Sequence, residues 1–126
     1  MKSKEKLESD LNKLSEAVVV DGVIAAILFG SRARGDYNQY SDYDLLIIFN
    51  SKQKLWENFE KLYSKISKTG LFVQVMPVAI EELKTLKKFL NTVLQEGIVI
   101  FKRYPFTTPP YILKIKPAAI ITYNFN

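Results

Sequence analysis

The stretch that decides the fold is VIAAILF-GSRARG-DYNQYS-DYDLLIIF, residues 23–49. Residues 23–29 and 42–49 are apolar along both faces of an extended chain, which predicts two buried strands. The polar residues 30–41 between them contain two glycines and predict a loop or a short helix. Polar and charged residues therefore stand at the rim of a buried sheet, where functional groups are commonly found.

The flanking sequence supplies helices and two more strands. Apolar residues at helical spacing predict one helix before this stretch and two after it. The apolar face of the first helix consists of Leu7, Leu11, Leu14 and Val18. The face of the second consists of Leu55, Phe59, Leu62 and Ile66, and that of the third of Leu83, Leu86, Leu90 and Leu94. Ser51 is the expected N-cap of the second helix, and Gly70 and Gly97 are the expected ends of the second and third. We expect Trp56 and Tyr63 to pack with the second face.

The remaining strands are predicted over residues 71–76, ending at Pro77, and over residues 98–101. The order of elements predicts an α/β (α+β) fold with a small mixed β-sheet flanked by about three helices. A length of 126 residues suits one compact domain.

Composition excludes several kinds of chemistry. The chain has no cysteine and no histidine, so it has no disulfide, no thiolate or imidazole metal ligand and no imidazole general base. No apolar run approaches the roughly 20 residues that span a bilayer, and the charged N-terminus does not resemble a signal peptide. We expect a cytoplasmic protein with no membrane partner.

The positive charge lies in the C-terminal third. Residues 1–83 carry 11 basic and 12 acidic side chains, whereas residues 84–126 carry 7 basic side chains and Glu96 alone. We therefore expect a folded domain over residues 1–102 and an extended, basic and aromatic segment over residues 103–126, packed on the domain or at an interface. Such a segment is also compatible with nucleic-acid binding, although an edge strand or subunit contact is the simpler interpretation.

The motif within residues 30–44 combines an anion site with a dicarboxylate. Gly30 and Ser31 follow a buried strand and can present backbone N–H groups and a hydroxyl to an anion, with positive charge from Arg32 and Arg34. Asp42 and Asp44 alternate along a strand, so their side chains leave the same face about 7 Å apart. Oxygen ligands of this kind suit Mg²⁺, and an anion cradle beside such a metal suits a nucleoside triphosphate.

These residues resemble a known family. Gly-Ser-x-Ala-Arg-Gly followed by Ser-Asp-x-Asp-Leu is similar to the signature of the DNA polymerase beta-like nucleotidyltransferase superfamily, and most of all to its minimal nucleotidyltransferase branch. The resemblance identifies residues 1–102 as the nucleotidyltransferase-like domain. It implies that Gly30, Ser31, Arg32 and Arg34 bind a nucleoside triphosphate, for which ATP is the expectation. It also implies that Asp42 and Asp44 hold Mg²⁺, and that a nucleoside monophosphate passes to a hydroxyl acceptor.

The sequence departs from this family at one catalytic position. Active members carry a third carboxylate on the next core strand, where this chain has Gln74, and no acidic residue occurs between Glu60 and Glu81. A neutral amide accepts no proton at neutral pH and ligates Mg²⁺ poorly. Two interpretations follow: a transferase, slowed by Gln74, or a degenerate domain that acts as an antitoxin-like partner of a small helical protein. A homodimer also remains open.

Overall fold

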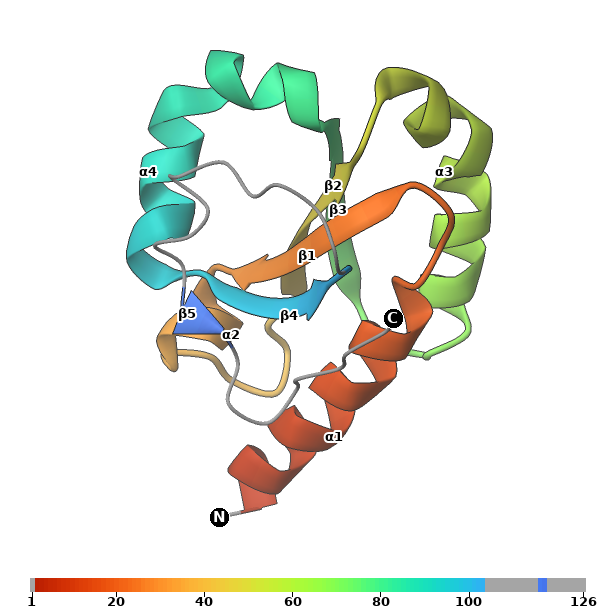
Figure 1. Ribbon diagram of the computed structural model, residues 1–126. Coiled ribbons are helices and arrows are strands. Elements are labelled where there is room, and N and C mark those ends of the chain that lie inside the picture. The colour runs from red at the N-terminus through yellow and green to blue at the C-terminus, as the bar shows by residue number, and fades with distance from the viewer. Residues whose placement is uncertain (1, 104–115, 118–126) are drawn as a thin grey trace.

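The computed structural model describes residues 2–103 and 116–117, and five strands of this part form one sheet (Figure 1). The elements in chain order are α1 (Lys2–Ala17), β1 (Val23–Phe29), α2 (Ser31–Arg34), β2 (Tyr43–Phe49), α3 (Lys52–Ser67), β3 (Val73–Ala79), the 3₁₀ helix η1 (Ile80–Leu86), α4 (Lys87–Glu96), β4 (Ile98–Lys102) and β5 (Lys116–Pro117). The strand order is β3-β2-β1-β4-β5. The β1–β2 and β1–β4 pairs are antiparallel, and the β2–β3 and β4–β5 pairs are parallel, so the predicted mixed sheet is confirmed.

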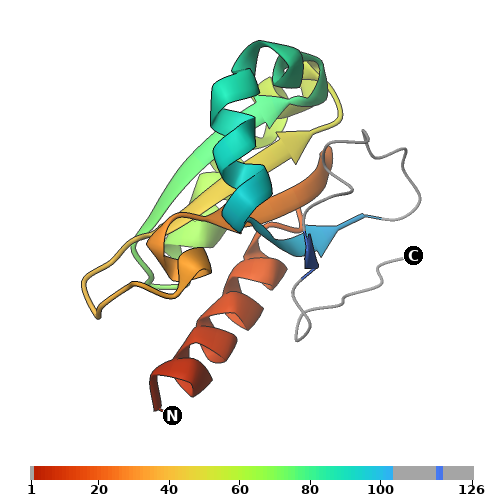
Figure 2. The same cartoon turned by 90° about the vertical axis from the view of Figure 1, so that its left-hand side faces the viewer.

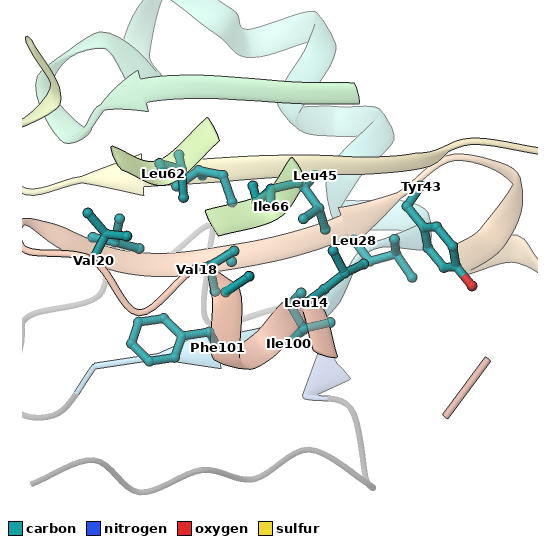
Figure 3. Close-up of a cluster of buried hydrophobic side chains, with 14 of the residues drawn as sticks. Leu14, Val18, Val20, Leu28, Tyr43, Leu45, Leu62, Ile66, Ile100 and Phe101 are labelled. Carbon is teal, nitrogen blue, oxygen red and sulfur yellow. The ribbon is translucent and has the colours of Figure 1, made fainter. Parts of the chain in front are cut away.

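The sheet has a helical layer on each face. Alternation along β2 sends Leu45 and Ile47 to one face, where they pack with α1 and α3, and sends Leu46 and Ile48 to the other, where they pack with η1 and α4. The α1–α3 face is closed by Leu14, Leu62 and Ile66, which are drawn in Figure 3. In Figure 2 α4 faces the viewer, in front of the sheet.

The two strands predicted on either side of the motif are confirmed almost residue for residue. β1 covers residues 23–29, and β2 begins at Tyr43, one residue later than expected. Ser51 caps α3 as predicted, because its hydroxyl accepts a hydrogen bond from the backbone N–H of Lys54 at 3.1 Å. Gly70 follows α3 with φ of 75°, the left-handed conformation that glycine adopts at low cost.

The predicted end of the third strand at Pro77 is wrong. β3 continues through Pro77 to Ala79, in register with residues 43–49 of β2. Phe72 accepts from the N–H of Tyr43 at 2.9 Å, so alternation along β3 directs the backbone of Pro77 away from β2. Because β3 is an edge strand, no ladder hydrogen bond is lost there.

Two predictions about the helices also need correction. The predicted third helix is divided into η1 and α4, and Glu82 accepts from the N–H of Ala79 at 2.8 Å where η1 begins. Trp56 and Tyr63 do not pack into the core: they are 71% and 41% exposed, and each meets Phe59 edge to face. Helical spacing alone does not separate a core stripe from an aromatic surface stripe.

The C-terminal segment is described only in part. Residues 116–117 form β5 beside β4, and the rest of the predicted basic and aromatic segment beyond residue 103 lies outside the described residues. Within the described ranges, no helix is long and apolar enough to cross a membrane.

Candidate functional site

Strand pairing brings the predicted site residues to one end of the sheet. Asp44 pairs with Phe29 of β1 on one side and with Gln74 of β3 on the other. Gly30 directly follows Phe29, so it lies next to Asp44. The adjacent strands β1, β2 and β3 thus place Gly30, Asp44 and Gln74 side by side, on the face of the sheet that α4 covers further along.

Gly30 is required by both its conformation and its neighbour. Its φ is 76°, a region that side-chain-bearing residues rarely adopt. A Cβ at this position would overlap Oδ2 of Asp44. The turn after β1 therefore approaches the carboxylate as closely as a backbone can, and the first residue of α2, Ser31, follows immediately.

The two aspartates interact electrostatically, as two carboxylates on one face must. Burial raises the pKa of Asp44 above its usual value, and the charge of Asp42 raises this pKa further. The nearby guanidinium of Arg34 acts in the opposite direction. A divalent cation between the carboxylates would remove this repulsion, and their oxygen donors are the type that Mg²⁺ prefers, so the residues present fit one such ion.

Gln74 lies on β3 directly beside Asp44, with which it pairs. Its Nε2 is 3.4 Å from Oδ2 of Asp42, with the amide as donor. Among the residues that the structure describes, no group of three or more acidic side chains is placed to hold a metal ion. The pair of aspartates is therefore flanked by a neutral hydrogen-bond donor.

Arg34 forms an ion pair with a carboxylate that is distant in the sequence. Its Nη1 donates to Oε2 of Glu96 at 2.6 Å, and its Nε donates to Oδ2 of Asp36 at 3.2 Å. Glu96 is the last residue of α4, and its side chain is only 9% exposed, against 47% for Arg34. The charge of Glu96 also raises the pKa of Asp44, which shows that this ion pair belongs to the site electrostatically.

Arg32 takes a different place from Arg34. It is buried, and its guanidinium carbon lies 4.5 Å from the ring centroids of both Tyr37 and Tyr43. Its Nε and Nη2 donate to the carbonyl of Ser41 at 3.1 and 3.0 Å. Tyr43 points to the α1 face of the sheet, opposite to Asp44, so Arg32 lies on the side of the loop that faces away from Asp44.

A second buried contact anchors this loop to α1. The hydroxyl of Tyr43 donates to Asp10, a carboxylate that is 2% exposed and also pairs with Lys6 at 3.1 Å. Burial and the Asp10 carboxylate raise the pKa of Tyr43 well above 10. Arg32 and Tyr43 thus fix the backbone on both sides of Asp42.

Sequence reasoning did not identify Glu96 or Asp10 as parts of this arrangement. Glu96 is 62 residues away from Arg34, and Asp10 is 33 residues away from Tyr43. The isolation of Glu96 as the last acidic residue of the chain was visible. Its partner was not, because the pairing depends on how α4 crosses the sheet.

The family comparison agrees with this geometry. The fold and site define a nucleotidyltransferase domain, and the family model described as "Polymerase beta, Nucleotidyltransferase" matches residues 6–105. The chain belongs to this family.

Two curated relatives come from Methanocaldococcus jannaschii. "Putative protein adenylyltransferase MJ0141" is 32% identical over 92 residues, covering 72% of this chain and 92% of the relative. "Putative protein adenylyltransferase MJ1305" is 30% identical over 113 residues, covering 79% and 77%. Among solved structures, a "putative nucleotidyltransferase" from Sulfolobus solfataricus has a TM-score of 0.56 at 21% identity, over 86% of this chain and 92% of that one. The last similarity concerns the fold.

Proposed function

We propose that this protein binds Mg²⁺ with a nucleoside triphosphate, most readily ATP, and transfers the nucleoside monophosphate to a hydroxyl group of a protein. The observation that carries the proposal is the convergence of Asp42 and Asp44 beside the Gly30 turn. The names of the two archaeal relatives support AMP as the transferred group and a protein as the acceptor.

The position of each residue in the site indicates the role that it would have. Asp42 and Asp44 would hold Mg²⁺, which when bound offsets the negative charge of the triphosphate and of the departing pyrophosphate. Gly30 and Ser31 would contact phosphate oxygens, and Arg34 would add a positive charge from the same turn. Arg32 would act as a positioning residue, because its donors hold the carbonyl that precedes Asp42.

The transfer itself is a simple displacement. The acceptor oxygen forms a bond to the α-phosphorus, the bond from that phosphorus to the β-phosphate bridge breaks, and pyrophosphate leaves. The acceptor proton must go to solvent or to a phosphate oxygen, since the Gln74 amide donates to Asp42 and accepts no proton. We therefore expect slow transfer.

The placement of Gln74 also favours a second candidate function. Lacking an acidic group at this position, the domain would bind nucleotide without turnover and act as an antitoxin-like protein-binding partner. The two candidates predict the same triphosphate site and differ in whether AMP is transferred.

Calorimetric titration of ATP tests the shared part of the proposal. We expect binding in the presence of Mg²⁺ that is lost in Asp42→Asn and retained in Asp21→Asn. Asp21 is a matched control, because it lies two residues before β1, at the end opposite to Gly30. Labelling with α-³²P-ATP then separates the two candidates. Absence of Mg²⁺-dependent ATP binding in the folded wild-type protein would refute both.

A further inference from the structure

Arg34, a cation that could bind phosphate beside the Gly30 turn, is already paired with Glu96. Nη1 of Arg34 lies 2.6 Å from Oε2 of Glu96, and Nε lies 3.2 Å from Asp36. A carboxylate and a phosphate compete for the same guanidinium N–H groups, because both present paired oxygens in one plane. A triphosphate can bind this part of Arg34 only if it displaces Glu96 or shares the guanidinium group with it.

Glu96 is the stronger competitor of the two carboxylates. Its side chain is 9% exposed, whereas that of Asp36 is 63% exposed. Separating a poorly hydrated carboxylate from its cation leaves a charge without solvent or partner, which is costly. An exposed carboxylate such as Asp36 is readily rehydrated and holds the guanidinium weakly.

The charges around Arg34 give this competition a consequence for ligand choice. The charges of Asp42 and Glu96 both act on Asp44, and Arg34 is the guanidinium that acts on it in the opposite direction. With Glu96 neutralising Arg34, a metal-free triphosphate meets a net negative site. A triphosphate that arrives with Mg²⁺ brings its own positive charge to the aspartates and depends less on Arg34.

We propose that Glu96 is a specificity-determining residue that withholds Arg34 from phosphate, so that the site accepts a metal-loaded triphosphate and rejects a metal-free one. The proposal rests on the proposed function in that it takes Asp42 and Asp44 as the metal ligands. Glu96, the last residue of α4, would thus determine whether the site binds the metal-loaded or the metal-free form of the same nucleotide.

A double-mutant cycle tests the proposal. The proteins are wild type, Glu96→Gln, Arg34→Gln and the double variant, and the probe is inorganic tripolyphosphate in EDTA, measured by calorimetry. Glu96→Gln should raise the affinity for metal-free tripolyphosphate about three- to fivefold, the upper end of the scale expected when a partly exposed ion pair is released. In the Arg34→Gln background the same substitution should change this affinity less than twofold.

The cycle separates release of Arg34 from simple loss of a negative charge. Asp21→Asn also removes a carboxylate from an ion pair, with Lys54 at 2.8 Å, but at the far end of β1, about 20 Å away. It should leave tripolyphosphate affinity unchanged. An equal gain with and without Arg34, no gain, or weaker binding in Glu96→Gln would each overturn the proposal.

A parallel titration with Mg²⁺ and ATP keeps this result distinct from the proposed function. Here Glu96→Gln should change the affinity less than twofold, so the ratio of metal-free to metal-loaded affinity rises. If wild type fails to bind Mg²⁺ with ATP, the proposed function fails. The EDTA series still decides whether Glu96 withholds Arg34.

Discussion

Replacing Gly30 with alanine should separate the cost of a strained turn from the loss of a metal site. The new methyl group meets two penalties. The φ of 76° costs a residue with a side chain about 1–2 kcal/mol. The Cβ also overlaps Oδ2 of Asp44, so the Asp44 carboxylate must rotate away from its place beside the Gly30 turn. We expect Gly30→Ala to fold with stability lowered by about 2 kcal/mol and to lose Mg²⁺-dependent ATP binding.

Gly70→Ala is the matched control for this experiment. Gly70 has nearly the same φ, 75°, but a Cβ there has no neighbour within 4 Å. Urea denaturation should show the cost of the positive φ in both variants and a larger total loss in Gly30→Ala, and calorimetry with Mg²⁺ and ATP should show lost binding only in Gly30→Ala. Normal binding by Gly30→Ala, or equal weakening in both variants, would refute the link between the turn and Asp44.

Two further predictions concern the buried contacts behind the loop. Arg32→Lys should lower the free energy of unfolding by about 1–3 kcal/mol and weaken the binding of ATP with Mg²⁺ several-fold, because lysine lacks the planar group that donates twice to Ser41 while facing two tyrosine rings. Denaturation and calorimetry on the folded variant check this. Unchanged values in both measurements would exclude a positioning role for Arg32. Burial and Asp10 raise the pKa of Tyr43 above 10, so above pH 10 the unfolded chain releases this proton first and stability falls as pH rises. Tyr43→Phe should flatten that alkaline loss by at most about 1.4 kcal/mol per pH unit, measured by urea denaturation from pH 8 to 11, and an equal slope in both proteins would contradict it.

The sequence predicts those parts of the site that are local in the chain. Gly30, Asp42 and Asp44 stand within or beside two apolar strands, and the strand period predicts the face on which Asp44 lies. The sequence predicts Gln74 on the next core strand, and the structure adds its pairing with Asp44. The different environments of Arg32 and Arg34 were not predictable. They occupy similar positions in the motif, yet one meets tyrosines on the α1 face and the other meets Glu96 on the α4 side.

Introducing an acid at Gln74 tests what the amide does for the aspartates. In the wild type, Nε2 of Gln74 points to Oδ2 of Asp42 at 3.4 Å and adds no negative charge. Gln74→Asp removes this donor and adds a third carboxylate beside Asp42 and Asp44, where the charge of Asp42 already raises the pKa of Asp44. Without metal, we therefore expect the variant to be less stable than wild type by about 1 kcal/mol.

A divalent cation should reverse that order. Three carboxylates bind Mg²⁺ more tightly than two, and ligand binding to the folded state stabilises it by mass action. In thermal unfolding with and without Mg²⁺, Gln74→Asp should therefore show the larger increase in Tm. Gln74→Asn, which keeps a neutral amide, should respond as wild type does. If Mg²⁺ raises the Tm of all three proteins equally, Gln74 does not occupy the third ligand position. In that case the slow transfer expected of this protein needs another explanation than the loss of a carboxylate on β3.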